Sequence, residues 1–377
     1  MDDLHASRPT SFQRLLFWAI LGGLSVFFAE VSIGSYPFPF TNAWGLLVVC
    51  PLYLLHLLVL GHVVLARRRP RLSALFFAGA LFGLYEAYMT KQVWNPDWSP
   101  DAIRVAGVAV LPATVLVLWW HATMAFFVPL LVAETALGGS RDVARALPRW
   151  VQRALFGRRG TVTLCALAAA LGCLHSSIPT NTPTAAHVAA SSTSAAAVVL
   201  ALAALYRWRT RGRRFPLRAL LPTGREMVLL CVCLALMYGG LGMLLRPEAL
   251  PPLGPQATVW LLYVFFGTVL WLALRSSPRA TEPELPEPAR PFPWRLWFAL
   301  AGIYVATSLA SRLLLGRLLV GPHFPAGATV VFALANFAVG VVVGVTMLIA
   351  SVYDVVRMTL ARARGRRSFA DATRPPS

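Results

Sequence analysis

The chain has 377 residues, of which 57% are hydrophobic and 13% charged, and its formal net charge is +19. Because a soluble domain carries about 25% charged residues, this composition excludes a soluble protein and predicts a polytopic membrane protein. The arginines stand in short runs between apolar segments, as in loops held against anionic lipid. Membrane lipids are therefore the expected partners of this charge, and no nucleic acid is expected.

Apolar segments of about 20 residues, the length that crosses a bilayer, predict an all-α fold: a transmembrane bundle of about ten helices. In chain order they cover residues 13–35, 44–66, 72–94, 107–135, 160–178, 185–206, 226–245, 257–274, 295–316 and 327–352. Pro112 and Pro129 predict kinks in the fourth helix. Gly79 and Gly83 predict a face of close helix packing on the third.

Arginines cluster in alternate connections, at residues 67–71, 141–159, 207–214, 275–295 and 362–367. All these basic segments fall on one side of the predicted bundle. The positive-inside rule then places both termini in the cytoplasm and the protein in the cytoplasmic (inner) membrane, crossing it several times. Within residues 140–157 an arginine recurs every four residues beside an apolar stripe, which predicts an amphipathic helix on the inner surface.

These features divide the chain into successive parts. We expect a four-helix N-terminal membrane unit at 1–139, an interfacial helix at 140–157, a second four-helix unit at 158–275, a Pro- and Glu-rich cytoplasmic linker at 276–293, a C-terminal helix pair at 294–356 and a basic cytoplasmic tail at 357–377. No internal repeat is visible, which weakens an inverted-repeat transporter.

A small set of ionisable residues lies inside the apolar segments of the N-terminal unit. Glu30, His56, Glu86 and His121 are predicted at similar depths in the outer half of the membrane. A charge in a bilayer costs several kcal/mol, so such residues normally face a partner or a cavity, and we expect these to share one pocket. Glu134 is expected at the inner end of its helix, in a plain salt bridge.

Lys91 is the single lysine among 34 Lys and Arg residues. An ammonium group can lose its proton when desolvated, whereas a guanidinium cannot, so this lysine is a candidate for a specific role. The predicted catalytic residues are thus Glu30, Glu86, His121 and Lys91. The simpler alternatives are that Lys91 snorkels to the outer interface, that the glutamates only pair with neighbouring helices, and that His121 is a neutral, hydrogen-bonded core histidine.

Three segments carry a resemblance, and they read FAEVSIGSYPF, LFGLYEAYMTKQVWNPDW and WWHATMAFFVPLLVAE. Over residues 28–135 the chain resembles an uncharacterised family of bacterial and archaeal polytopic membrane proteins. The family pattern maps onto Glu30, Gly34, Ser35, Pro37, Glu86, Lys91, Asn95, Pro96, His121, Pro129 and Glu134.

The chain departs from the family pattern at several positions. Tyr85 replaces a second Glu, Gly61 and His62 replace an Arg-Glu pair, and His56 replaces a small residue. The resemblance implies a shared outer-leaflet site and no known reaction.

Three functions remain open at this stage. An intramembrane enzyme acting on a lipid or a membrane-embedded substrate would use Glu30 or Glu86 as general base, His121 as a second proton carrier and Lys91 to hold an anionic headgroup. A small-solute or proton-coupled transporter would use the same residues as a proton relay. A structural or assembly protein would use them to lock helices together.

The sequence requires no cofactor. His56, His121, Glu30 and Glu86 are weak candidates for metal ligands, since two His and two Glu suffice chemically for zinc or iron. A haem held between His56 and His121 is a further alternative. The substrate is expected to be a small molecule or a lipid.

Overall fold

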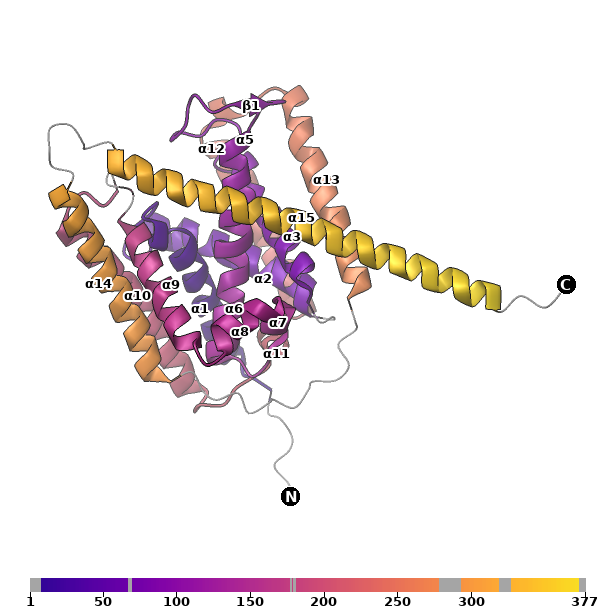
Figure 1. Cartoon of the computed structure of the whole chain (residues 1–377), viewed down its shortest axis with the longest axis horizontal. Helices are drawn as coiled ribbons and strands as arrows, with labels where there is room; N and C mark the ends of the chain where they lie inside the picture. The colour runs from indigo at the N-terminus through magenta and orange to yellow at the C-terminus, as the bar shows by residue number, and fades with distance from the viewer. Residues whose placement is uncertain are drawn as a thin grey trace, which may run out of the picture.

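The computed structural model describes residues 8–66, 70–176, 178, 181–277, 293–318 and 327–372, and it is a bundle of helices (Figure 1). The elements are α1 (Ser11–Ala29), η1 (Val31–Ile33), η2 (Gly45–Val49), α2 (Cys50–Leu65), α3 (Leu72–Gly83), α4 (Tyr85–Tyr88), β1 (Arg104–Val105), β2 (Val108–Ala109), α5 (Val110–Ala113), η3 (Thr114–Phe127), α6 (Val128–Leu137), α7 (Asp142–Ala146), α8 (Arg149–Phe156), α9 (Gly160–His175), α10 (Ala185–Arg209), α11 (Leu217–Leu220), α12 (Gly224–Leu244), η4 (Pro247–Ala249), α13 (Leu253–Ser276), α14 (Trp294–Leu318) and α15 (Gly327–Ala372).

The all-α prediction is confirmed, and the described residues hold only a two-stranded antiparallel hairpin, β1–β2, besides the helices. Eight helices among them are long and apolar enough to cross a membrane, and a ninth candidate is the pair α8–α9, which bends by 90°. The segment Leu72–Tyr88 is apolar but shorter. The predicted total of about ten thus corresponds to eight full-length candidates, one bent pair and one short segment.

Two predicted helices end or break earlier than expected. The third ends at Tyr88 instead of residue 94, and Lys91 follows it with a left-handed backbone (φ 59°). The surface helix predicted over 140–157 is two helices, α7 and α8, separated at Pro148. Proline has no backbone N–H and forces the preceding residue out of the helical region, and Leu147 is indeed extended (ψ 149°).

The long fourth helix runs without interruption through α5, η3 and α6, and η3 is wound as a π-helix. Pro129 cannot donate a hydrogen bond to the carbonyl of Ala125, four residues earlier. The Ser25 hydroxyl of α1 donates to that carbonyl instead, at 2.5 Å. A buried backbone acceptor is thereby satisfied from the neighbouring helix.

The predicted small-residue face of α3 packs against η3. A Cβ atom added at Gly79 would lie 2.6 Å from the Cα of Ala122, and one added at Gly83 would lie 2.8 Å from the Cα of Val117. The two backbones therefore approach more closely than any larger residue would permit. This contact fixes the position of His121, which lies on the same stretch of η3.

The last two helices pack on different parts of the bundle. Helix α14 lies against α9 and α10, whereas α15 lies across α3, η3 and α13 (Figure 1). At one end of this crossing Phe337 stacks on Trp98, with ring centroids 5.1 Å apart. At the other end the Asp354 carboxylate accepts a hydrogen bond from Ser73 (2.9 Å) and pairs with Arg71 (3.7 Å).

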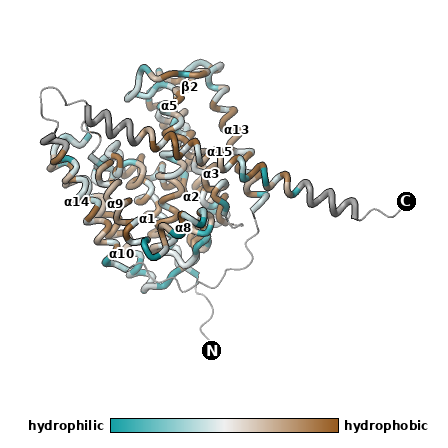
Figure 2. Tube along the Cα trace, in the orientation of Figure 1, coloured by the Kyte–Doolittle hydropathy of each residue, from teal (hydrophilic) through white to brown (hydrophobic). Residues whose placement is uncertain are grey.

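The bundle has two distinct ends. The arginine-rich end gathers the N-terminal side of α1 and the segments 134–159, 207–226 and 271–277, and hydrophilic residues are prominent there around α8 and the end of α10 (Figure 2). It is tied together by Arg14, which contacts Glu226 at 2.5 Å, and by Gln13, which donates to the Arg209 carbonyl at 3.0 Å. The opposite end, formed by residues 30–44, 89–109 and 245–253, is called the pocket end below.

Candidate functional site

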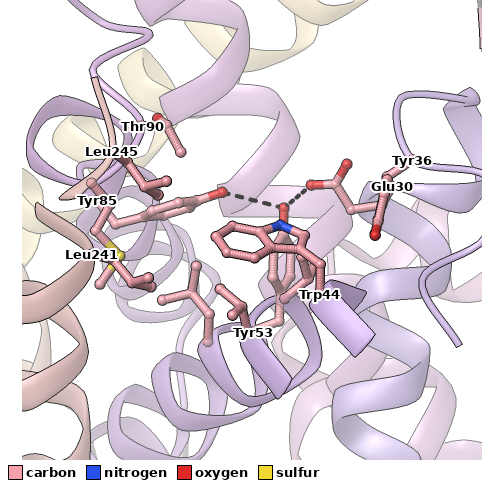
Figure 3. Close-up of a pocket in the computed structure, with 12 residues that line it drawn as sticks. Glu30, Tyr36, Trp44, Tyr53, Tyr85, Thr90, Leu241 and Leu245 are labelled. Atoms are coloured by element: carbon pink, nitrogen blue, oxygen red, sulfur yellow. Dashed lines mark hydrogen bonds between the residues drawn. The ribbon is translucent and has the colours of Figure 1, made fainter. Parts of the chain in front are cut away.

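A cavity of about 140 Å³ lies at the pocket end, between the end of α1, the start of α2 and the end of α12 (Figure 3). Its walls are mainly apolar, and its polar groups are one carboxyl and several hydroxyls. The lining residues are Glu30, Tyr36, Trp44, Val48, Val49, Leu52, Tyr53, Tyr85, Met89, Thr90, Leu241 and Leu245. A small apolar cavity with a few converging polar groups is the usual form of a ligand site.

Glu30 is placed in this cavity by the way α1 ends. The chain turns through the 3₁₀ segment η1 and through Gly34, whose φ of 73° favours glycine. The turn carries Ser35 back towards the helix end, where its hydroxyl donates to the Glu30 carboxylate at 2.5 Å. The Tyr53 hydroxyl of α2 donates to the same carboxylate, whose residue remains half-buried (Figure 3).

From Glu30 a chain of polar groups leads into the protein. The Tyr53 hydroxyl lies 3.4 Å from the Tyr85 hydroxyl and 3.3 Å from Nε2 of His121. The Tyr85 hydroxyl lies 3.2 Å from the same nitrogen. The side chains of Tyr53, Tyr85 and His121 are all buried. In such surroundings hydrogen bonds are strong, and a polar group without a partner destabilises the fold.

His121 and Glu86 form the inner end of this chain. Nδ1 of His121 donates to the Leu116 carbonyl at 2.9 Å, which leaves Nε2 as the acceptor in the neutral ring. Nε2 lies 3.5 Å from Oε1 of Glu86, whose other oxygen accepts a hydrogen bond from Thr90. In the neutral ring both atoms of this contact are acceptors, so it becomes a hydrogen bond or an ion pair only when a proton is bound to Glu86 or to Nε2.

The structure therefore brings Glu30, Glu86 and His121 into one connected cluster, although of these three only Glu30 lines the cavity. His56 stacks on Phe82 (ring centroids 4.5 Å apart) and has separate partners: Nδ1 bonds to the Leu52 carbonyl at 2.8 Å and Nε2 to the Tyr238 hydroxyl at 3.0 Å. In the described part of the chain no three His, Cys, Asp or Glu side chains are grouped to hold a metal ion. The predicted ligand set is thus not assembled.

Lys91 is placed differently from either prediction. Its side chain is fully buried, and its ammonium donates to the carbonyls of Met89 (3.2 Å), Gly242 (2.5 Å) and Leu245. It neither snorkels to an interface nor is available to a headgroup, because its three donors are occupied. Burial lowers the pKa of Lys91; the Glu248 carboxylate opposes this shift and Arg246 adds to it. The cause of the error is the turn after Tyr88, which directs the side chain onto the end of α12.

Lys91 and Arg246 together fasten the end of α12 to the segment that follows α4, and we call this pair the clasp. A cation over the terminal carbonyls of a helix is favourable because they carry its negative dipole end. Arg246 completes the attachment by donating to the carbonyls of Thr90 (3.2 Å) and Asn95 (2.8 Å) and by pairing with Asp97 (2.7 Å). The clasp holds Leu241 and Leu245 in place as one wall of the cavity.

The predicted position of Glu134 is corrected by the structure. Glu134 caps a helix: its carboxylate accepts the backbone N–H groups of Val143 (2.9 Å) and Ala144 (3.0 Å) at the start of α7. His175 of α9 is also fully buried, and it bonds to the Val31 carbonyl (2.5 Å) and to Ser191 (2.7 Å).

Sequence reasoning missed the four hydroxyl residues that line the cavity, Tyr36, Tyr53, Tyr85 and Thr90. For Tyr85 a signal was present, since it stands where the resembling family has a second Glu. Tyr53 and Thr90 carry no such signal, because tyrosine and threonine are unremarkable in an apolar segment.

Comparison with known proteins agrees with the fold. Residues 19–364 match a family described as an uncharacterised membrane protein family. A protein of Archaeoglobus fulgidus, itself described as uncharacterised, is 31% identical over 339 residues, which cover 89% of this chain and 98% of that protein. No solved structure matches significantly.

Proposed function

Since this chain belongs to an uncharacterised family of membrane proteins, we propose that it is an intramembrane enzyme that acts on a lipid or another membrane-embedded substrate at Glu30. The observation that carries this proposal is a carboxyl group in a largely apolar cavity, joined through the Tyr53 hydroxyl to the buried His121–Glu86 pair. We further propose that the protein is a multi-pass protein of the cytoplasmic (inner) membrane with both termini in the cytoplasm.

In the proposed reaction Glu30 is the general base. Its carboxylate takes a proton from a substrate hydroxyl or from a water molecule in the cavity, which leaves Glu30 protonated and the oxygen negatively charged. Tyr53 orients the carboxylate through the hydrogen bond that it donates. The proton can pass along Tyr53 and Tyr85 to His121 and Glu86, which serve as the second proton carrier.

The surroundings of the cavity favour entry from the lipid. Trp44, a lining residue, is 47% exposed, and neighbouring Leu47 and Leu244 are 74% and 77% exposed. Helix α12, which forms one wall, has no buried residue at all. Large exposed apolar side chains around a cavity suit contact with acyl chains better than contact with water.

A proton-coupled transporter would need a route from His121 to the arginine-rich end. Gly79 packs closely on Ala122, the residue after His121, so no space for such a route is left between α3 and η3 at this point. This packing favours the enzyme over the transporter.

The test is a comparison of lipid profiles by mass spectrometry in cells that lack the gene and in cells that express variants. Wild-type protein and Asp101→Asn, a change in an exposed loop, should both restore the profile of the parent strain. Glu30→Gln should accumulate in the membrane to the same level, measured by immunoblot, and should leave the profile of the deletion.

Restoration of the profile by Glu30→Gln would overturn the proposed role of the carboxylate. A deletion that leaves every lipid unchanged but alters the uptake of a solute would instead support the transporter.

A further inference from the structure

The hydrogen-bond inventory of the cavity indicates what kind of head group it can take. The protons of its four hydroxyl groups all have acceptors. Tyr36 donates to Asn42 (2.6 Å), Tyr53 to Glu30, Thr90 to Glu86, and Tyr85 to Nε2 of His121 (3.2 Å). Towards a ligand these hydroxyls therefore present oxygen lone pairs, and so does the Glu30 carboxylate.

The charge of the cavity points in the same direction. Among its described lining residues none is Lys, Arg or His, and the one ionisable carboxyl is Glu30. Lys91 and Arg246, which lie behind the wall formed by Leu241 and Leu245, are both engaged in the clasp with backbone carbonyls. A phosphate placed here would meet a carboxyl and lone pairs without a compensating cation, which is strongly unfavourable in an apolar site.

The size of the cavity sets a limit on the head group. Its volume of about 140 Å³ is close to the roughly 150 Å³ of an apolar cavity that admits one benzene molecule. A group of about six non-hydrogen atoms therefore fits. At the mouth the indole of Trp44 supplies an N–H donor, which suits an oxygen acceptor at the start of the apolar part of the ligand.

We infer that the ligand of this cavity is an uncharged lipid alcohol with a small hydroxyl-bearing head, such as a diacylglycerol, and not a phosphate-bearing phospholipid. The hydroxyl donates to Glu30 or to a lining hydroxyl oxygen, and the chains lie outside, along α2 and α12. This inference rests on the proposed function in one respect: the hydroxyl that binds is the group from which Glu30 takes its proton.

The experiment is photo-crosslinking of the full-length protein in phosphatidylcholine nanodiscs with a diacylglycerol that carries a diazirine on its acyl chain. The crosslink should map to peptides that contain residues 44–49 or 241–245. Unlabelled dioleoylglycerol should compete at a concentration at least tenfold lower than dioleoyl phosphatidic acid. Leu241→Trp, which fills the cavity, should reduce the crosslink at least fivefold. Leu236→Trp in the same helix should not, because Leu236 is 69% exposed and does not line the cavity.

Equal or better competition by phosphatidic acid would overturn the inference, and so would a crosslink that is unchanged by Leu241→Trp. These outcomes are independent of the lipid profiles in cells. If the protein binds diacylglycerol selectively but its Glu30→Gln variant restores the lipid profile, the proposed enzymatic role is wrong and the inferred class of ligand still stands.

Discussion

At the residue scale, the surroundings of Lys91 favour a lysine over an arginine at this position. Its ammonium sits among three carbonyl oxygens, and the residue has no exposed surface. A guanidinium is wider and planar, and its donors point in a fixed fork. We expect Lys91→Arg to displace the end of α12 and to lower the stability of the protein by about 1–3 kcal/mol, a typical result of overpacking.

The measurement is the midpoint of thermal unfolding of the purified protein in detergent. Because the chain uses arginine almost everywhere else, Arg8→Lys at an exposed position is a suitable control for exchanging the two cations, and it should leave the midpoint unchanged. A Lys91→Arg protein as stable as the wild type would show that the carbonyls bind any cation.

The cost of burying charge in a membrane was enough to single out Glu30, Glu86 and His121 from the sequence, and the structure brings them together. Their connection could not be predicted, since it depends on Tyr53 and Tyr85, whose hydroxyls cost little in an apolar helix. The direction of Lys91 could not be predicted either. It follows from a left-handed turn at Lys91 (φ 59°), and spacing along an ideal helix gives no sign of such a turn.

At the scale of the elements, the contact between α3 and η3 positions both Glu86 and His121. Gly79→Ala should separate these helices, because the new Cβ would lie 2.6 Å from backbone atoms of Ala122, which cannot yield as a flexible side chain would. We expect a loss of about 1–3 kcal/mol, measured as a lower midpoint of thermal unfolding. Gly240→Ala in α12, where the added atom meets nothing within 4 Å, is the matched control and should be neutral.

The start of α7 gives a second prediction about an element. Glu134→Ala removes the acceptor of the Val143 and Ala144 N–H groups and should cost about 0.5–2 kcal/mol, as the loss of a helix cap does. Trypsin should then cleave faster at Arg141 and Arg145, measured by mass spectrometry of the peptides. Unchanged cleavage rates relative to the wild type would argue that α7 does not depend on this cap.

The extents of most long helices follow from hydropathy alone, as the match between the predicted span 185–206 and α10 (Ala185–Arg209) shows. The breaks were harder to predict. Pro148 marks the break between α7 and α8, whereas the prediction of one helix rested on the regular spacing of the arginines. The end of α4 at Tyr88 has no proline or glycine to mark it, and it depends on tertiary contacts such as the Lys91 clasp.

At the scale of the whole molecule, the positions of the basic segments lead to a test of topology. The structure gathers the described arginine-bearing segments 134–159, 207–226 and 271–277 at one end, and the cytoplasmic side is the expected position of that end. Reporter fusions at Gly254, at the pocket end, and at Ala370, near the end of α15, should therefore report opposite sides of the membrane. Finding both on one side would contradict the proposed topology.

Helix α12 is anchored at its two ends and, between them, by the hydrogen bond between Tyr238 and His56 of α2. Arg14 and Glu226 fix its start, and the clasp fixes its end, while no residue along its length is buried. The last turns of the helix can bow between the Tyr238 contact and the clasp without breaking either, and bowing there widens the cavity mouth beside Leu241. The rate at which lipids exchange with the cavity should therefore rise in thin or loosely packed bilayers and fall in thick, ordered ones. The mechanical state of the membrane would then control access of lipids to the cavity.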